Sequence, residues 1–198
     1  MMPSREQGRL RIESDGGWPV SDTIEFLHAF KAAYENILIF EMLLEGFAAP
    51  RLSVPRTPIL NNRGLNLSTA LWELPDEALA RFLRPDDQLI LQRVELSSPG
   101  FWEFAGALNP LEVLRMYLND RHRRRQDRTY REAHERHRLA LENILLENQV
   151  FRERMRMAEE YGLSDQDMTQ LLNRFVYEPI QQIDIIDARG MVSFGGNE

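Results

Sequence analysis

The sequence contains no cysteine and only one lysine, Lys31. Without cysteine, disulfide bonds, thiolate metal ligands and cysteine-based catalysis are excluded, and the composition fits a reducing compartment. With one lysine, nearly all positive charge is carried by arginine, whose planar guanidinium favours paired hydrogen bonds to carboxylates or phosphates. We therefore expect a cytoplasmic protein that makes arginine-based ion pairs.

Long apolar runs are also lacking. The longest, residues 37–49, is interrupted by Glu41 and Glu45 and falls short of the about 20 residues that a membrane-spanning helix requires. Residues 1–13 contain no apolar segment of the kind found in secretory signals. We therefore expect neither an integral membrane protein nor an exported one.

The local patterns of common active sites are missing as well. Gly16 and Gly17 follow a candidate strand but lack the spaced third glycine and the lysine of a phosphate-binding loop. His134 and His137 are three positions apart, whereas the zinc-protease motif places its histidines four apart. We predict no catalytic residue, no cofactor and no metal site, although an enzyme whose site is assembled from scattered residues leaves no such pattern.

One stretch dominates the chain, from Asn109 to Gly162. It holds no proline after Pro110 and no glycine before Gly162. Asn109, Pro110 and Glu112 match the N-cap, first and third positions of a helix, and Gly162 matches a helix end. If unbroken, this helix would be about 75 Å long, although a second capping pattern beginning at Thr129 permits a break near residue 127.

The residues before this stretch predict a mixed fold. Residues 9–13 alternate polar and apolar side chains, which indicates a strand with one wet face. Residues 21–45 predict a helix whose second half is apolar nearly all round and should be buried. Residues 88–96 form the strongest strand candidate, with 89–91 expected to be fully buried, and weaker signals predict a strand at 65–71 and a helix at 75–83.

These elements predict an α+β fold: a small N-terminal sheet with one buried helix, followed by a long, mostly helical C-terminal arm or hairpin. We expect a small α+β domain at residues 1–100, a helical arm or bundle at 101–190 and a flexible tail at 191–198. Within the arm, Ser164 is expected to start a helix ending near residue 177, and Pro179 to start another.

The long helix carries two apolar stripes, each of which needs a packing partner. In a heptad frame, the a and d positions form a coiled-coil seam with one central asparagine, a residue type that specifies register. The second stripe, on the opposite side, contains Leu139, Leu146, Val150 and Met157. Both stripes could pack within one bundle, but we expect the seam to join two copies of the chain. The seam residues are Leu141, Ile144, Asn148, Phe151, Met155 and Ala158.

Charge is uneven along the chain. Residues 1–110 carry 10 basic and 15 acidic side chains (−5), residues 111–140 carry 9 and 5 (+4), and residues 141–198 carry 5 and 11 (−6). The basic middle includes a run of possible anion-binding residues, Arg121, Arg123, Arg124, Arg125 and Arg128.

This arginine run has three interpretations. It can be a solvated helix face paired with acidic neighbours. It can contact nucleic-acid phosphates, which the acidic remainder of the chain disfavours. It can also attach to an anionic membrane surface, with Phe101, Trp102 and Phe104 as an apolar wedge, although such a segment more often docks on a sheet.

From Ser98 onward, the run SPGFWEFAGALNPLEVLRMYLNDRHRRRQDRTYRE resembles a stretch of uncharacterised bacterial proteins that end in a charged helix. A weaker likeness extends over YEPIQQIDI near the C-terminus. The resemblance implies a bacterial cytoplasmic protein. It implies no activity, so no functional residue is carried over.

The function predicted from these patterns is a non-enzymatic, self-associating adaptor or regulatory module that oligomerises through the long helix. Its expected partner is a second copy of itself, as a homodimer or larger assembly, or another protein. Two alternatives remain open: a peripheral membrane or polyanion-binding protein, and an enzyme without a local signature.

Overall fold

The computed structural model describes residues 5–14, 17–48, 83–97, 99–126, 134–160, 162–187 and 192–193. The strand predicted at 65–71 lies outside these residues, as do the helix predicted at 75–83, apart from Leu83, and most of the predicted tail. The described elements are β1 (Gln7–Ser14), α1 (Val20–Ala48), the short 3-10 helix η3 (Pro85–Asp87), β2 (Ile90–Glu95), β3 (Gly100–Ala107), α4 (Leu108–Gln126), α5 (His134–Glu147), α6 (Gln149–Glu160), α7 (Asp165–Leu172), the π-helical turn η4 (Asn173–Tyr177), α8 (Glu178–Asp187) and β4 (Val192–Ser193).

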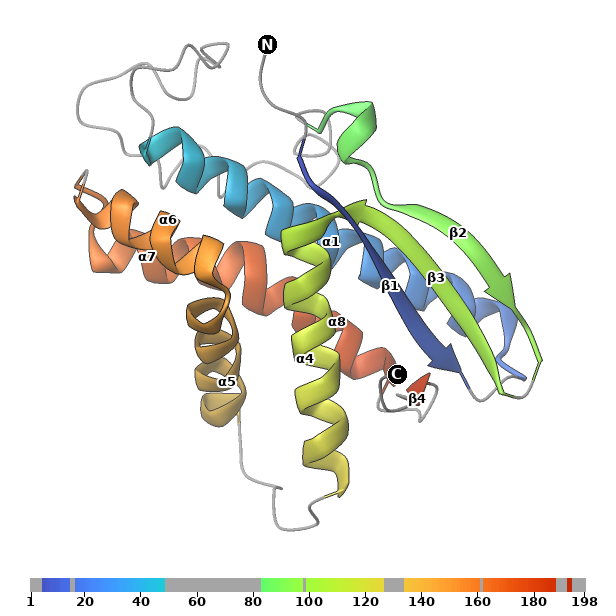
Figure 1. The fold of residues 1–198 in the computed structure, drawn as a ribbon. Helices are drawn as coiled ribbons and strands as arrows, with labels where there is room; N and C mark the ends of the chain where they lie inside the picture. Colours follow the sequence, from blue (N-terminus) through green and yellow to red (C-terminus); the bar gives the residue numbers. More distant parts are fainter. Residues whose placement is uncertain are drawn as a thin grey trace.

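The four strands form one antiparallel sheet in the order β2-β3-β1-β4. The first strand pairs with β3 along its whole length, from Gln7 opposite Ala107 to Ser14 opposite Gly100. Figure 1 shows α1 crossing behind this sheet, with the remaining helices gathered beside it. The predicted α+β fold class is confirmed.

The alternation predicted for the first strand is confirmed. In β1, Leu10 and Ile12 are buried, whereas Arg9 and Arg11 are exposed on the other face of the sheet. The apolar half of α1 is also buried as predicted: Ile37 and Phe40 are fully buried, and the helices α4, α6 and α8 and the turn η4 pack against α1. The sheet and α1 therefore form the centre of the fold.

The strand predicted at 88–96 exists, but its predicted burial is wrong. Residue Leu89 is only partly buried, and Ile90 and Leu91 are exposed. They are exposed because β2 is the edge strand of the sheet. A continuous apolar run usually indicates a buried strand, and here it lies at an edge.

The long stretch from 109 to 162 is not one helix. A break at Asn148 separates α5 from α6, and the side-chain oxygen of Asn148 accepts hydrogen bonds from the backbone N–H groups of Val150 and Phe151. This is the geometry of an N-cap. The asparagine that the heptad frame placed inside a continuous seam instead begins a new helix, so the helical part can fold back on itself.

Two helix boundaries agree with prediction. Gly162 has a φ of +100°, and the N–H groups of Gly162 and Leu163 donate to the carbonyls of Glu159 and Ala158. This pattern is a Schellman motif, in which glycine accepts the left-handed backbone at low cost. Ser164 then caps α7, since its hydroxyl accepts a hydrogen bond from the N–H of Asp167.

The two helices predicted after Ser164 are in fact one continuous helical run, α7–η4–α8. Pro179 lies inside it. A proline lacks an N–H group and its ring crowds the preceding turn, and the run widens into the π-helical turn η4 just before it. The wider turn accommodates the proline without ending the helix.

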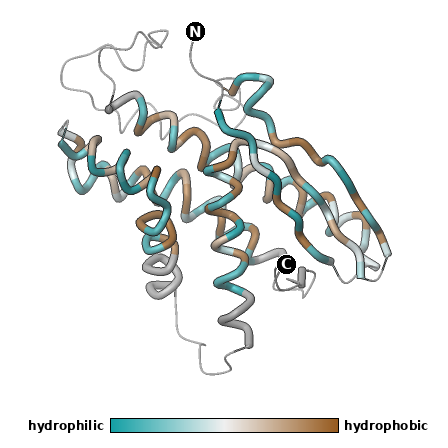
Figure 2. Tube along the Cα trace, viewed as in Figure 1, coloured by the Kyte–Doolittle hydropathy of each residue, from teal (hydrophilic) through white to brown (hydrophobic). Residues whose placement is uncertain are grey.

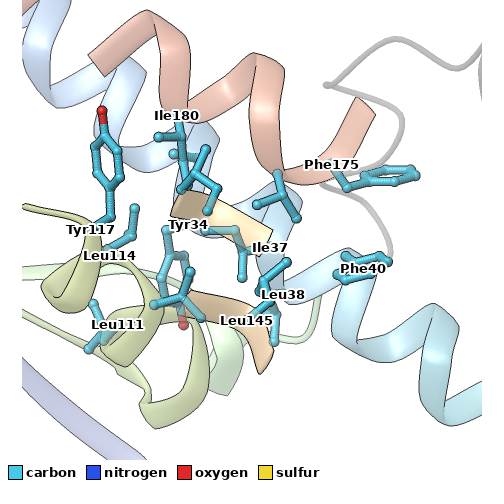
Figure 3. Close-up of a cluster of buried hydrophobic side chains, with 14 of the residues drawn as sticks. Tyr34, Ile37, Leu38, Phe40, Leu111, Leu114, Tyr117, Leu145, Phe175 and Ile180 are labelled. Carbon is cyan, nitrogen blue, oxygen red and sulfur yellow. The ribbon is translucent and has the colours of Figure 1, made fainter. Parts of the chain in front are cut away.

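The core joins both halves of the chain (Figure 3). Side chains of α1, α4, α5, η4 and α8 meet in one apolar cluster, in which Figure 3 shows Leu38 of α1 close to Leu145 of α5. The ring of Phe40 stacks on Phe151 of α6 with centroids 5.9 Å apart. The helical part therefore packs on α1 in the same chain.

Leu145 and Leu146 provide a matched test of this core. Leu145 is fully buried, whereas Leu146 is 41% exposed. We expect Leu145→Ala to lower the free energy of unfolding by about 2–5 kcal/mol, because it leaves a cavity, and Leu146→Ala to change it by about 0.5 kcal/mol or less. Urea unfolding followed by circular dichroism measures both losses, and equal losses would contradict the described docking of α5.

Candidate functional site

The predicted oligomer seam lies inside the chain. Its six side chains, from Leu141 to Ala158, are all buried, with Asn148 the most exposed at 9%. They are covered because α6 packs along α1 and α5 packs against α4 and α6. The interpretation of these residues as a surface for a second copy is therefore wrong. In the second stripe, Leu146 is exposed and Val150 and Met157 are half-buried, whereas the side chain of Leu139 is not described.

The predicted apolar wedge is also used inside the chain. Phe101, Trp102 and Phe104 belong to β3, which lies between β1 and β2 in the sheet. Trp102 and Phe104 are buried beneath α1 and its neighbours, where Trp102 meets Trp18 with ring centroids 4.5 Å apart. These side chains are not available to a membrane surface, so the wedge interpretation is corrected to a central strand.

Phe101 points to the opposite face of the sheet. The guanidinium of Arg11 lies 3.8 Å from its ring centroid, and that of Arg93 lies 5.1 Å away. Two cations thus cover an aromatic ring that would otherwise face solvent. The arginines on this face therefore have a structural task.

The predicted arginine run is described only at its start. Arg121 of α4 forms an ion pair with Asp184 of α8 at 2.8 Å and also donates to the Asp184 carbonyl. The hydroxyl of Tyr117 donates to the same carboxylate. Arg121 therefore joins two helices. The side chains of Arg123, Arg124 and Arg125 and all of Arg128 lie outside the described residues, so their anion binding stays a prediction.

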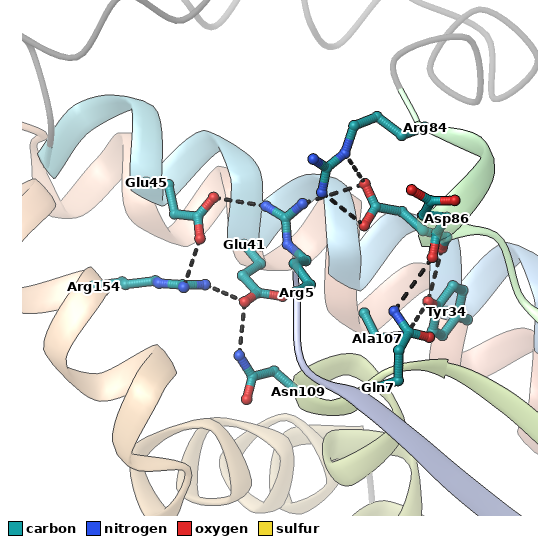
Figure 4. Close-up of polar contacts among 11 residues, drawn as sticks. Arg5, Gln7, Tyr34, Glu41, Glu45, Arg84, Asp86, Ala107, Asn109 and Arg154 are labelled. Atoms are coloured by element: carbon teal, nitrogen blue, oxygen red, sulfur yellow. Dashed lines mark hydrogen bonds and ion pairs between the residues drawn. The ribbon is translucent and has the colours of Figure 1, made fainter. Parts of the chain in front are cut away.

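The most concentrated group of charges is a network that joins α1 to the rest of the fold (Figure 4). Glu41 is 1% exposed and lies on the buried part of α1. One of its oxygens accepts from Arg154 of α6 and, at 2.7 Å, from the side chain of Asn109 of α4. Arg154 also reaches Glu45 at 2.6 Å. One glutamate therefore connects three helices.

The N-terminal segment enters the same network through Arg5. Its guanidinium pairs with Glu45 at 2.7 Å and with Asp87 at 3.4 Å. Asp87 also accepts two hydrogen bonds from Arg84, at 2.8 and 3.1 Å. The carboxylates on α1 and η3 are thus bridged by arginine, as the near absence of lysine leads one to expect.

Tyr34 closes this region from the side of the sheet. Its hydroxyl donates to the carbonyl of Asp87 at 2.8 Å and accepts from the N–H of Ala107 at 2.6 Å. Burial of the side chain raises the pKa of Tyr34 to about 12, despite the hydrogen bond from Ala107, and the nearby carboxylates add to the increase. The hydroxyl therefore stays protonated and joins α1, η3 and β3.

The arrangement of these groups is that of a structural network. The carboxylates of Glu41, Glu45 and Asp87 accept from arginine or asparagine. Except for the local pair of Arg84 with Asp87, these contacts join segments far apart in the sequence. In the described part of the chain, no group of three or more His, Asp or Glu side chains is placed to hold a metal ion, and none of the described helices could span a membrane.

The surface that sequence reasoning missed is β2. Its exposed apolar side chains are Ile90 (56%), Leu91 (41%) and Val94 (43%), with Leu96 (77%) just beyond the strand. Figure 2 shows hydrophobic positions, in brown, along this outer strand. The apolar run itself was a signal, but hydropathy does not distinguish a central strand from an edge strand.

Comparisons of this chain with protein-family models, with curated proteins and with solved structures found no match. Functional inference therefore depends on the surface and the contacts described above.

Arg154 and Arg156 test the network with a matched pair on one helix. The side chain of Arg154 is 19% exposed and bridges Glu41 and Glu45, whereas that of Arg156 is 72% exposed and pairs with Glu160 at 3.5 Å. We expect Arg154→Ala to lower the free energy of unfolding by about 3 kcal/mol, because it leaves a buried carboxylate uncompensated. Arg156→Ala should cost about 0.5 kcal/mol or less. Chemical unfolding of both variants measures the difference, and a small loss for Arg154→Ala would contradict the proposed role.

Asp87 predicts a pH dependence. Burial alone would raise the pKa of Asp87, but the hydrogen bonds from Arg84 and the charge of Arg5 outweigh burial and hold the pKa below its ordinary value of 3.8. The unfolded chain therefore binds this proton at higher pH than the folded chain does, so the stabilisation is complete above about pH 4–5 and is lost as the pH falls through the lowered pKa. We expect Asp87→Asn to be less stable than wild type at pH 7.

This stability gap between wild type and Asp87→Asn should narrow as the pH falls from 4 towards 2. Urea titrations at pH 7, 4 and 2.5 measure it. A gap that stayed constant with pH would show that the ionised carboxylate contributes nothing.

Proposed function

We propose that this protein is a non-enzymatic, self-associating module that serves as an adaptor or regulator in the cytoplasm. The observation that carries the proposal is the apolar surface of the edge strand β2, where Ile90, Leu91, Val94 and Leu96 are all more than 40% exposed. The lack of cysteine and the acidic charge of −7 are compatible with the proposed compartment.

Exposed apolar side chains on a strand support association for two reasons. Leu91 and Val94 lie on one face of the sheet and Ile90 on the other, and apolar side chains that gather into a large patch on one face mark interaction sites. The edge of a sheet also presents unpaired N–H and C=O groups, which another strand can pair with. The strand β2 has both exposed apolar side chains and an open edge. Its burial against a second polypeptide would remove apolar area from water and would also give its edge N–H and C=O groups hydrogen-bond partners.

Contacts elsewhere in the fold support the interpretation of the protein as a rigid scaffold for the β2 surface. The seam side chains of α5 and α6 are buried against other helices of the same chain. Association would therefore use the edge of the sheet. The buried carboxylates of Glu41 and Asp87 pair with Arg154 of α6 and with Arg5 of the N-terminal segment, respectively. Ion pairs that join separate parts of the fold favour a rigid protein, which can present the edge strand β2 as a fixed surface.

Solution mass tests this proposal. We expect static light scattering after size exclusion to give a mass of two or more chains at micromolar concentration, falling towards 23.2 kDa on dilution. Leu96→Lys should shift this equilibrium towards monomer, because it places a charge in the apolar contact. Leu146→Lys is the matched control, since Leu146 is an exposed leucine on α5, and should leave the mass unchanged. A wild-type monomer at all concentrations would refute self-association.

A further inference from the structure

We propose that two copies of the chain join by antiparallel pairing of β2 with β2 of the second copy, across a two-fold axis at Val94. This inference rests on the proposed self-association and names the contact that produces it. The resulting sheet would contain the four strands of each copy, with the two β2 strands side by side at its centre.

The position of β2 makes this pairing available. The strand order β2-β3-β1-β4 leaves β2 at one end of the sheet, and in the part of the chain that the structure describes it pairs with β3 alone. The other end is β4, which has only two residues, Val192 and Ser193. A strand of six residues with an open edge is thus the better template for a second strand.

The charges on β2 select one register. Arg93 and Glu95 are both exposed, lie two positions apart on the same face and approach each other at 3.8 Å within one chain, so pairing across the axis would exchange this loose contact for two between copies. In an antiparallel pair centred on Val94, each Arg93 faces the Glu95 of the other copy, which gives two attractive contacts. Centring the pair on Arg93 or on Glu95 would place like charges opposite each other. The charge pattern is therefore self-complementary in one arrangement.

The apolar side chains fit the same register. Val94 pairs with Trp102 and Leu91 with Phe104, so both lie on the face of the sheet that α1 covers. Leu96 lies two residues after Val94 and continues this face. With the axis at Val94, the two valines face each other, and Leu96 of each copy lies diagonally beside Val94 of the other copy, so part of the exposed apolar surface around Val94 is removed from water.

The pairing also closes on itself. A β-bulge between Leu91 and Arg93 interrupts the regular ladder with β3, and bulges commonly end regular pairing at sheet edges. A two-fold contact uses the same surface on both copies, so it forms a dimer and leaves no second open β2 edge. The proposal therefore predicts a dimer and excludes a growing fibre.

The charge register provides the experiment. We expect R93E and E95R each to weaken self-association by at least about tenfold, because two attractive contacts become repulsive. Mixing the two variants in equal amounts should restore association, since one copy then carries two acidic and the other two basic side chains at these positions. Sedimentation velocity of each variant and of the mixture measures the effect, and native mass spectrometry identifies the heterodimer.

Controls separate this proposal from the more general one. Arg156→Glu, a charge reversal on exposed α6, should leave the dimer intact, and circular dichroism should show that E95R melts like wild type. A wild-type monomer would refute self-association itself. A wild-type dimer that R93E and E95R do not weaken, or whose loss mixing does not restore, would refute the β2 contact and leave self-association standing.

Discussion

The fold depends on one helix, α1, whose second half is apolar on nearly all sides. Because α1 presents large side chains such as Phe30, Leu38 and Phe40 in different directions, a sheet on one face cannot bury it. The remaining faces need helices, and α4, α6, η4 and α8 supply them. The part of the chain that follows the sheet therefore packs back on α1, and this packing buries the apolar seam of α5 and α6. Such burial on all sides is what the apolar second half of α1 requires.

A single charge within α1 orients this packing. Glu41 interrupts the apolar run and is 1% exposed, so an unpaired carboxylate there would be costly. Its partners come from two other helices, Arg154 of α6 and Asn109 of α4. Apolar packing alone would allow α6 and α4 to slide along α1, whereas the directional contacts of Glu41 form in only a few relative positions of these helices. Among the described residues, Oε2 of Glu41 is buried without a hydrogen-bond partner, so the network limits the position of α6 at some cost in stability.

Local signals in the sequence predicted the local elements well. The alternation at Leu10 and Ile12, the glycine stop at Gly162 and the cap at Ser164 depend on a few neighbouring residues, and each appears in the structure. What failed was the assignment of partners. Periodicity shows that Phe151 and Met155 share a helix face, but it does not say whether α1 of the same chain or a second copy covers that face. The same limit applies to β2, whose apolar residues look identical in sequence at the centre and at the edge of a sheet. Asn148 was likewise ambiguous, because asparagine suits both a seam position and an N-cap.

The pairing of β1 with β3 has a consequence for how the protein is made. The ladder joins Gln7 to Ala107 and Ser14 to Gly100, positions 100 and 86 residues apart along the chain (107 minus 7, and 100 minus 14). Contacts so distant in sequence form slowly, because the intervening chain must first lose its freedom. During synthesis, β1 and the apolar α1 leave the ribosome long before β3 exists. The apolar half of α1 is therefore synthesised well before the strand β3 and the helices that cover it, and during that time its apolar surface is exposed to association with other chains.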